Sequence, residues 1–262
     1  MKLSEELQWR GFVNQMTFDD ISKVDTPRKF YFGVDPSADS MQIGNLAAAM
    51  MVRLFMEYGH EAYLLVGGAT GMIGDPDGRK DEREIRNADT VAHNVECISA
   101  QYRRVFEGRD FHLVNNADWF RNINYIDFLY KVGKYMSMTQ LLDREFVQSR
   151  IGEGGSGISY AEFSYSLMQG YDFLHLFREH GVTLQVCGAD QWGNSTTGVS
   201  LIRKLEGGEA HVYSVPLVIN KATGRKFGKS EGGAIWLDEN KTSVYKFYQF
   251  WLNVHYARPR YD

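Results

Sequence analysis

The sequence predicts an α/β protein, a doubly wound parallel sheet with a helical insertion between its two halves. Short apolar runs bounded by glycine or proline alternate with longer segments of helical period, and the runs at 29–34, 61–67 and 110–114 are the clearest. This order is typical of right-handed βαβ units, whose helices cover both faces of the sheet. Ligands of such sheets bind at the carboxyl ends of the strands.

The first predicted strand is KFYFGV, residues 29–34, which is aromatic and β-branched and is followed by Asp35 and Pro36. A helix follows. Asp39 and Ser40 are residue types that favour a helix N-cap, and Gly59 ends the apolar period. The apolar residues at helical spacing are Ile43, Leu46, Met50, Leu54 and Tyr58.

The strand EAYLLVG at 61–67 leads into the glycine-rich loop 67–80. Residues 89–107 then predict a helix ended by Gly108, and DFHLV at 110–114 predicts the next strand. Residues 124–151 predict two helices, YIDFLYKVG and TQLLDREFVQSRI, which with the hinge-like EGGSG segment form the insertion.

A long helix is predicted from Ser159 to about His180. It leads to the strand TLQVC, the polar turn GADQWGN, a helix to about Leu205 and a strand VPLVI near 215–219. Residues 220–233 are basic, glycine-rich and without apolar period, so we expect a mobile loop there.

Composition excludes several classes of protein. The 262 residues are 44% apolar and 24% charged with a net charge of -4, which fits one large globular domain and argues against a broad cationic nucleic-acid surface. Cys97 and Cys187 lie far apart without a CxxC pattern, so we expect reduced thiols in the cytoplasm and no structural zinc. Without a leader-like start or an apolar run near 18 residues, we expect no contact with a membrane.

The turn DPSADSMQIGN is the first candidate site, because it joins a strand to a helix whose N-terminus can receive phosphate. Gly44 permits close approach of a ligand, and Gln42 and Asn45 are donors near the first turn. The alternative is a capped helix without a ligand. The second candidate is the glycine-rich loop with Asp75, whose alternative is a solvated turn; its cations are Arg79, Lys80 and Arg83.

The third candidate is the long helix, where Tyr165, Gln169 and Asp172 share one face at spacing i, i+4, i+7. Such a polar stripe is costly in a core unless it lines a site, although His175 could continue it as an outward polar face. The fourth is TGRKFGKS, residues 223–230, which lacks the spacing of a phosphate-binding P-loop. Its lysines could meet phosphate, or the loop could simply be solvated.

No histidine, cysteine or serine has a base beside it in these segments, so the chemistry is predicted to rely on positioning and electrostatics. Taken together, the segments resemble the class I aminoacyl-tRNA synthetases, and among them the tyrosyl-tRNA synthetases. The matching blocks, in order, are YFGVDPSADSMQIGNL, LVGGATGMIGDPDGRK, QSR, EFSYSLMQGYDF, LQVCGADQWGN, KFGKS and IWLDENKTSVYKFYQFW.

The resemblance implies a Rossmann-type catalytic domain over 1–220 that activates tyrosine with ATP and Mg²⁺ and passes it to tRNA(Tyr). It also implies a cytoplasmic homodimer with its contact in the insertion, about 120–158. Residues 221–262 would be the KMSKS-type loop and the start of a linker to an anticodon-binding domain that this sequence lacks. We therefore expect tyrosine activation to be retained and tRNA charging to be weak.

The resemblance also implies roles for single residues. Tyr31 and Asp172 would bind the phenol hydroxyl, and the remaining tyrosine-binding residues would be Asp75, Tyr165, Gln169, Gln185 and Gln191. The ATP-binding residues would be Gly33, Asp35, Gly44, Gly188, Asp190, Lys226, Phe227, Lys229 and Ser230. The groups that act on the phosphates during catalysis would be Ser37, Gln42, Asn45, Arg79, Arg83, Lys226 and Lys229.

The sequence departs from the family pattern in two respects. Gln42 and Asn45 replace the histidines of the HIGH signature and cannot become cationic, and Arg79 stands where lysine is usual. The rival hypotheses are a tryptophan-specific synthetase of the same fold and an inactive relative that binds tyrosine or RNA. A carboxylate at the para position of the ring, supplied by Asp172, favours tyrosine.

Overall fold

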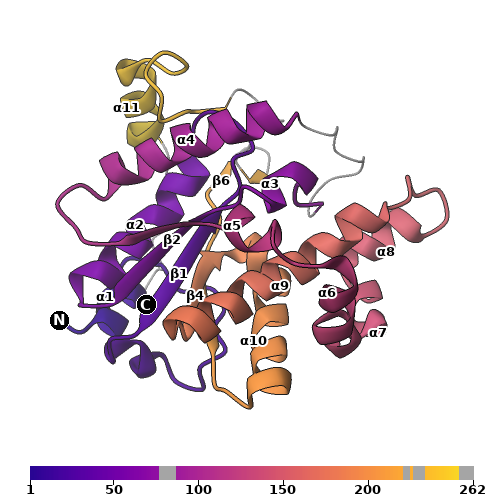
Figure 1. Cartoon of the computed structure of the whole chain (residues 1–262). Helices are drawn as coiled ribbons and strands as arrows, with labels where there is room; N and C mark the ends of the chain where they lie inside the picture. The colour runs from indigo at the N-terminus through magenta and orange to yellow at the C-terminus, as the bar shows by residue number, and fades with distance from the viewer. Residues whose placement is uncertain (77–86, 221–224, 227–233, 254–262) are drawn as a thin grey trace.

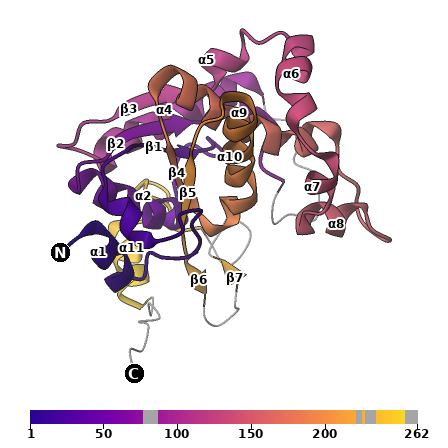
Figure 2. The ribbon, with the colours of Figure 1, turned by 90° about the horizontal axis from the view of Figure 1, so that it is seen from below.

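A computed structural model describes residues 1–76, 87–220, 225–226 and 234–253. Within these residues, five strands form a parallel sheet in the order β3-β2-β1-β4-β5 (Figures 1 and 2). The strands are β1 Lys29–Val34, β2 Glu61–Val66, β3 His112–Asn115, β4 Leu184–Gly188 and β5 His211–Val215. This sheet confirms the predicted fold class.

Helices cover both faces of the sheet, and the alternation of side chains along each strand explains why (Figures 1 and 2). Even-numbered residues of β1 and β2, such as Phe30 and Leu64, share one core cluster with helices α1, α2 and α4. Tyr31 and Tyr63 face the other way and join a second cluster with α9 and α10. The helices are α1 Leu3–Trp9, α2 Ile43–Glu57, α4 Ala88–Val105, α9 Tyr160–His180 and α10 Trp192–Glu206.

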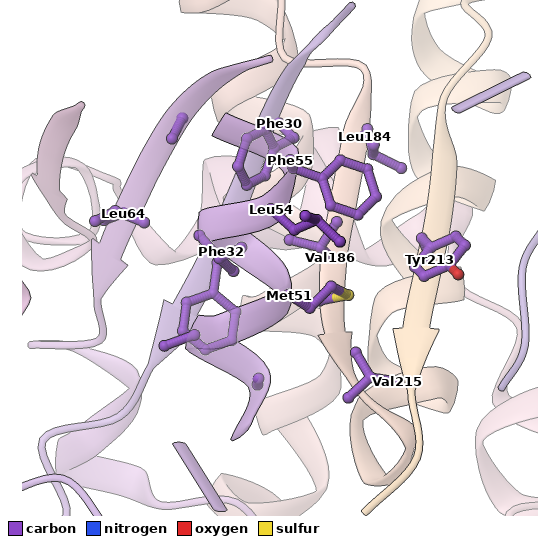
Figure 3. Packing of buried hydrophobic residues seen from close by; sticks show 14 of the residues in the cluster. Phe30, Phe32, Met51, Leu54, Phe55, Leu64, Leu184, Val186, Tyr213 and Val215 are labelled. Atoms are coloured by element: carbon purple, nitrogen blue, oxygen red, sulfur yellow. The ribbon is translucent and has the colours of Figure 1, made fainter. Parts of the chain in front are cut away.

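The first cluster packs α2 across the middle of the sheet. Met51, Leu54 and Phe55 of α2 lie over Phe30 and Val186 (Figure 3). Each of these side chains is at most 4% exposed, and burying a large apolar side chain contributes about 1.5–3 kcal/mol. This packing sets where α2 begins, and therefore where its N-terminus points.

The chain reverses its direction across the sheet between β1 and β4. It runs outward from β1 to β2 and β3, and then returns to β4 beside β1 and continues to β5. The β1–β2 ladder extends from Lys29↔Glu61 to Val34↔Val66, whereas β1 and β4 pair only at Phe30↔Leu184 and Tyr31↔Gln185. The carboxyl ends of β1 and β4 therefore meet at a topological switch point, where such folds bind ligands.

Helices α9 and α10 pack unusually closely through two glycines. A Cβ added at Gly170 would lie 2.6 Å from Thr197 Cγ2, and one at Gly198 would lie 2.7 Å from Phe173 Cβ. Because neither contact can be relieved without moving a helix, the two glycines fix the position of α9 over the sheet.

The segment between β3 and α9 is helical and projects to one side of the sheet (Figure 1). It contains α5 Ala117–Phe120, α6 Tyr125–Lys131, α7 Met138–Leu142 and α8 Glu145–Ile151. The second predicted helix, TQLLDREFVQSRI, is wrong as a single helix because the chain breaks at Arg144, which is the N-cap of α8. The division of the chain into domains stays a prediction.

The segment after the predicted loop is attached to the start of α2. The amide of Ile43 donates to the Ile235 carbonyl at 3.1 Å, and the amide of Leu237 donates to the Met41 carbonyl at 3.0 Å. A short antiparallel pair, β6 Ile219–Asn220 and β7 Arg225–Lys226, precedes it, and α11 Val244–Asn253 follows it. The remaining residues of the predicted loop lie outside the described residues.

Two local predictions are wrong. The strand near 215–219 is instead β5 at His211–Val215, because Pro216 cannot donate to a ladder and HVYSV packs on both faces. The α2 N-cap is Gln42 rather than Asp39 or Ser40. Asp39 pairs with Lys241 at 2.5 Å, and the Ser40 hydroxyl accepts from the side-chain amide of Gln101 at 2.8 Å.

The other boundaries moved by a few residues at most. The strand predicted at 110–114 is β3 at His112–Asn115, and Ser159 caps α9 as its position suggested. No helix in the described part of the chain is long and apolar enough to cross a membrane.

Candidate active site

The glycine-rich loop after β2 is where three segments of the site converge. A Cβ at Gly67 would lie 2.2 Å from Asp35 Oδ1, and one at Gly68 would lie 2.4 Å from Asn115 Oδ1. At Gly71 it would lie 2.8 Å from Pro36 Cδ. Glycine is required at these positions because the loop touches the ends of both neighbouring strands, β1 and β3.

Asp172 lies buried in the middle of α9, 2% exposed, and neutral groups hold its carboxyl. The Asn116 amide donates to Oδ2 at 3.1 Å and the Trp119 indole N–H donates to Oδ1 at 2.9 Å. Burial raises the pKa of Asp172 to about 8, the nearby Asp35 charge adds to that effect, and the two hydrogen bonds oppose it. Such a carboxyl retains acceptor capacity for a buried hydroxyl and, when protonated, can also donate to one.

Three buried polar atoms near this carboxyl have no hydrogen-bond partner among the described residues. They are the hydroxyl of Tyr31, Oε1 of Gln169 and Oε1 of Gln185. Tyr31 and Gln185 are register partners on β1 and β4, and burial, then the charge of Asp172, holds the pKa of Tyr31 well above its usual range. An unpaired buried polar group costs about 1–3 kcal/mol, so a polar ligand here would be favoured.

A continuous chain of hydrogen bonds joins Asp172 to Tyr165. The Asn116 amide that contacts Asp172 also donates to Thr70 Oγ1 at 2.9 Å, and the Thr70 hydroxyl donates to Asp35 Oδ1 at 2.7 Å. The Tyr165 hydroxyl donates to Asp35 Oδ2 at 2.9 Å. The predicted residues Asp35, Tyr165 and Asp172 are thus brought into one network.

Asp75 is hydrogen-bonded to the residue that precedes α10. The side-chain amide of Gln191 donates to Asp75 Oδ2 at 2.6 Å. Burial, followed by the charges of Asp35, Asp75 and Asp172, holds the pKa of Tyr165 well above its usual range. Three carboxyl groups around one tyrosine hydroxyl form a region suited to an ammonium group.

The start of α2 contributes the predicted phosphate-binding turn. The amide of Gln42 donates to Asn45 Oδ1 at 3.0 Å, so the oxygen of Asn45 caps its own helix. Gly44 is exposed, and Gln42 and Asn45 are half-buried. Ser37 is half-buried in the preceding turn, where its amide donates to the carbonyl of Asp35 at 2.7 Å.

The predicted adenosine-binding residues lie at the carboxyl ends of β1 and β4. Gly33 is exposed although β1 is the central strand of the sheet. Gly188 is the last residue of β4, and a Cβ there would lie 2.9 Å from Asp190 Oδ1. The backbone is thus open at Gly33, and the Asp190 carboxylate lies close over Gly188.

Several predicted residues cannot be placed. Arg79, Arg83, Phe227, Lys229 and Ser230 lie outside the described residues, and Lys226 is described only as part of β7. Thr70, Asn116 and Trp119 were missed by the sequence interpretation. Thr70 lies in the predicted glycine-rich loop and Asn116 lies two residues after the predicted strand, whereas Trp119 carried no signal of this kind. His175 stacks on Trp119 with ring centroids 4.4 Å apart, so it packs behind the site rather than taking part in it.

Comparison with known proteins gives one consistent family. The family described as tRNA synthetases class I (W and Y) matches residues 23–261. A tyrosine–tRNA ligase of Levilactobacillus brevis is 48% identical over 97% of this chain and 61% of its own length. One of Bacteroides fragilis is 47% identical over 97% of this chain and 60% of its own length.

The folds agree as well. The crystal structure of a C-terminally truncated mitochondrial tyrosyl-tRNA synthetase of Aspergillus nidulans has a TM-score of 0.83 and 27% identity, covering 97% of this chain and 76% of its own. The corresponding Coccidioides posadasii structure has a TM-score of 0.81 and 29% identity, covering 97% and 75%. The chain spans about three fifths of the length of the curated relatives it matches.

Proposed function

This chain belongs to the class I tRNA synthetases for tryptophan and tyrosine, and on that premise we propose that it is the catalytic part of a tyrosine–tRNA ligase. It would activate L-tyrosine with ATP to tyrosyl-adenylate and pyrophosphate, and then transfer tyrosine to tRNA(Tyr). The observation that carries the proposal is Asp172, a buried carboxyl held by neutral donors beside the unpartnered hydroxyl of Tyr31.

The phenol hydroxyl of tyrosine would donate to Asp172 and accept from Tyr31. Phenylalanine would offer no hydroxyl to Asp172 and would leave the buried Tyr31 hydroxyl without a partner, which is the costly outcome for a polar pocket. Tryptophan would present a larger ring and a donor at a different position, and it remains the rival substrate to test.

The α-ammonium group of tyrosine would lie among Asp75, Tyr165 and Gln169. Because the Tyr165 hydroxyl donates to Asp35, its oxygen is left to accept from an ammonium group. Gln185 and Gln191 would orient the amino acid and its carboxylate.

ATP would lie across the switch point between β1 and β4. Gly33 and Gly188 would let the nucleoside approach the backbone, with Asp190 accepting from the ribose and Asp35 lining the same pocket. The remaining ATP and phosphate contacts are proposed for Ser37, Gln42, Gly44, Asn45, Arg79, Arg83, Lys226, Phe227, Lys229 and Ser230.

In the activation step, a carboxylate oxygen of tyrosine bonds to the α-phosphorus of ATP. The bond from that phosphorus to the oxygen bridging to the β-phosphate breaks, and pyrophosphate leaves with the electron pair. No protein nucleophile is needed, because alignment of the reactants and positive charge near the departing phosphates lower the barrier.

Mg²⁺ is proposed to arrive with ATP and to neutralise charge on its phosphates. In the described part of the chain, no group of three or more histidine, cysteine, aspartate or glutamate side chains could hold a metal ion. The donor set around the α2 turn consists of amides and a hydroxyl, which suits phosphate oxygens rather than a metal. We expect excess EDTA to abolish activation while tyrosine binding persists.

The chain is also proposed to act in the cytoplasm as a homodimer. Tyr125, Ile126, Tyr130 and Met138 of the helical segment after β3 are all more than half exposed, and a second copy would cover such apolar side chains. Sedimentation that gives a monomer at every concentration would contradict the dimer. Binding of tRNA(Tyr) by this chain is proposed to be weak.

The first test is tyrosine-dependent ATP–pyrophosphate exchange, with tryptophan and phenylalanine as controls, because it needs no tRNA. Exchange with tyrosine alone is the expected result. Exchange with tryptophan instead would reverse the substrate assignment.

Saturable tyrosine binding without any exchange would identify an inactive relative or a chain disabled at its altered signature. The double variant Gln42→His/Asn45→His separates these two, because restored exchange would assign the loss to the signature.

A further inference from the structure

Arg144, at the corner between α7 and α8, reaches from the helical insertion into the junction of α9 and α10. Its guanidinium donates to the Ser166 hydroxyl on α9, to Asn194 Oδ1 at 2.8 Å, to the Gly193 carbonyl at 2.7 Å and to the Thr197 hydroxyl at 2.7 Å. Figure 1 shows α8 beside this end of α9. One side chain thus bridges three helices.

The acceptors of Arg144 are themselves buried. Ser166 is 1% exposed, Asn194 is 4% and Thr197 is 6%. Because buried polar groups are costly without a partner, the guanidinium supplies hydrogen bonds that these groups cannot obtain from water. The four acceptors together therefore suit the planar guanidinium of arginine, which can donate several hydrogen bonds at once.

The orientation of the Asn194 amide follows from these contacts. Its Oδ1 accepts from Arg144 and also from the Ser166 hydroxyl at 2.5 Å. With the oxygen directed to these donors, the Nδ2 group faces Oε1 of Gln191 at 3.4 Å. A donor-only cation at one end thus determines which way the amide of Asn194 points.

The orientation of Asn194 in turn determines the orientation of the Gln191 amide, which contacts Asp75 of the proposed amino-acid site. Because Gln191 receives the Asn194 amide on its oxygen, its own nitrogen faces Asp75 Oδ2, at 2.6 Å. Asp75 is an acceptor when ionised, so the network has a donor-only group at one end and an acceptor-only group at the other. Each amide between them has one consistent orientation.

We propose that Arg144 is a positioning residue that orients Asn194 and Gln191 and thereby holds Asp75 in place to receive the α-ammonium group of the substrate. The proposal rests on the proposed function in this respect, because it assigns the ammonium group to Asp75. Arg144 itself contacts neither substrate. It makes the helical insertion part of the support for amino-acid recognition.

The test compares two ligands that differ only at the amino group. Binding of tyrosine and of 3-(4-hydroxyphenyl)propionate, which lacks the amine, is measured by calorimetry for the wild type, Arg144→Met and the exposed α10 control Arg203→Met. For Arg144→Met, the tyrosine Kd is expected to rise about tenfold, as for loss of one supporting hydrogen bond. The Kd of the deamino ligand should change less than twofold, and Arg203→Met should leave both unchanged.

Equal losses for the two ligands in Arg144→Met would assign Arg144 a structural role only and overturn the proposal. Unchanged tyrosine binding would also overturn it. Thr197→Val, which removes an acceptor of Arg144 that is not on the route to Gln191, should preserve tyrosine binding. If the methionine variant does not fold, Arg144→Lys is used, and the same difference between ligands is expected with a smaller amplitude.

A ligand-free measurement separates this proposal from the proposed function. The side-chain amide signals of Gln191, assigned by their loss in Gln191→Glu, should shift in the NMR spectrum of Arg144→Met without any substrate. Unmoved signals would overturn the positioning role even in an active enzyme. Failure of the wild type to bind tyrosine, with shifted signals in the variant, would instead count against the proposed function and support the network.

Discussion

Two buried carboxyl groups on the same helix, α9, have opposite surroundings. Glu162, in the first turn, lies 2.8 Å from the guanidinium of Arg150, and the two side chains are 3% and 2% exposed. Asp172, in the middle of the helix, is as deeply buried, but no lysine or arginine in the described part of the chain pairs with it. Neutral side chains at the N-cap of α5 and within α5 hold it instead.

The presence or absence of a cationic partner distinguishes a structural carboxyl from a candidate ligand-binding carboxyl, whereas burial does not. A buried charge is tolerated when a cation compensates it, as at Glu162, where the pair joins α8 to α9. At Asp172 no cation offsets the loss of solvation, and burial raises the pKa of the carboxyl to about 8. A polar group kept in such a state is a candidate for ligand recognition.

The largest effect is expected from breaking the ion pair. Arg150→Met should lower the free energy of unfolding by about 3–5 kcal/mol, because Glu162 would remain buried without its cation. The double variant Arg150→Met/Glu162→Leu should recover most of that loss. Urea unfolding measures both, and a single variant as stable as the double would contradict the assignment of a structural ion pair.

Asp172→Asn should instead leave the fold intact and reduce activity. The kcat/KM for tyrosine in pyrophosphate exchange should fall about 10- to 100-fold, because an amide in place of the carboxyl would leave one of the buried donors around it without an acceptor, at a cost of about 1–3 kcal/mol. The exposed Asp143→Asn serves as the control. Wild-type exchange by Asp172→Asn would show that this carboxyl does not recognise the substrate.

The pH dependence of stability should distinguish Asp172 from its asparagine variant. Its pKa is raised in the folded protein, so between about pH 4 and pH 8 the folded state holds a proton that the unfolded chain has released. The wild-type free energy of unfolding should therefore fall with rising pH in this window, by up to about 1.4 kcal/mol per pH unit relative to Asp172→Asn. Parallel pH profiles for the two proteins would contradict the raised pKa.

The smallest effect is expected at Trp119. Trp119→Phe removes the indole donor to Asp172 but keeps an aromatic ring against His175. The KM for tyrosine should rise by about two- to tenfold, corresponding to a neutral hydrogen bond of about 0.5–1.5 kcal/mol, with little change in melting temperature. A large loss of stability would mean that Trp119 serves the core rather than the carboxyl.

The framework of the fold could be predicted because its signals are local. The run at 29–34 and the capped helix at 160–180 contain their own period and boundaries, and both match the structure. The strand β5 was misplaced because VPLVI is more apolar than HVYSV, although Pro216 removes a ladder donor there. Helix α1 was not predicted, and at seven residues it depends on packing against η1 Ile21–Asp25 and α2 rather than on intrinsic propensity.

The site could be predicted only in part, for a related reason. Tyr165, Gln169 and Asp172 could be selected as candidate site residues from their spacing on one helix. The family resemblance supplied Tyr31 and Gln185. The groups that connect them, Thr70, Asn116 and Trp119, act across 35 to 56 positions of sequence. Their roles arise from tertiary contacts that no local pattern encodes.

The spacing of Tyr165 and Asp172 on α9 also fixes the distance between these two side chains along the helix axis. Seven residues of α-helix advance about 10 Å along the axis, and α9 is held rigid against α10 by Gly170 and Gly198. If Tyr165 contacts the amine and Asp172 the far end of the ring, as we propose, the distance between these two contacts is fixed by the helix. It can change only by whole helical positions, so a longer amino acid would have to meet a different residue of α9 at its tip.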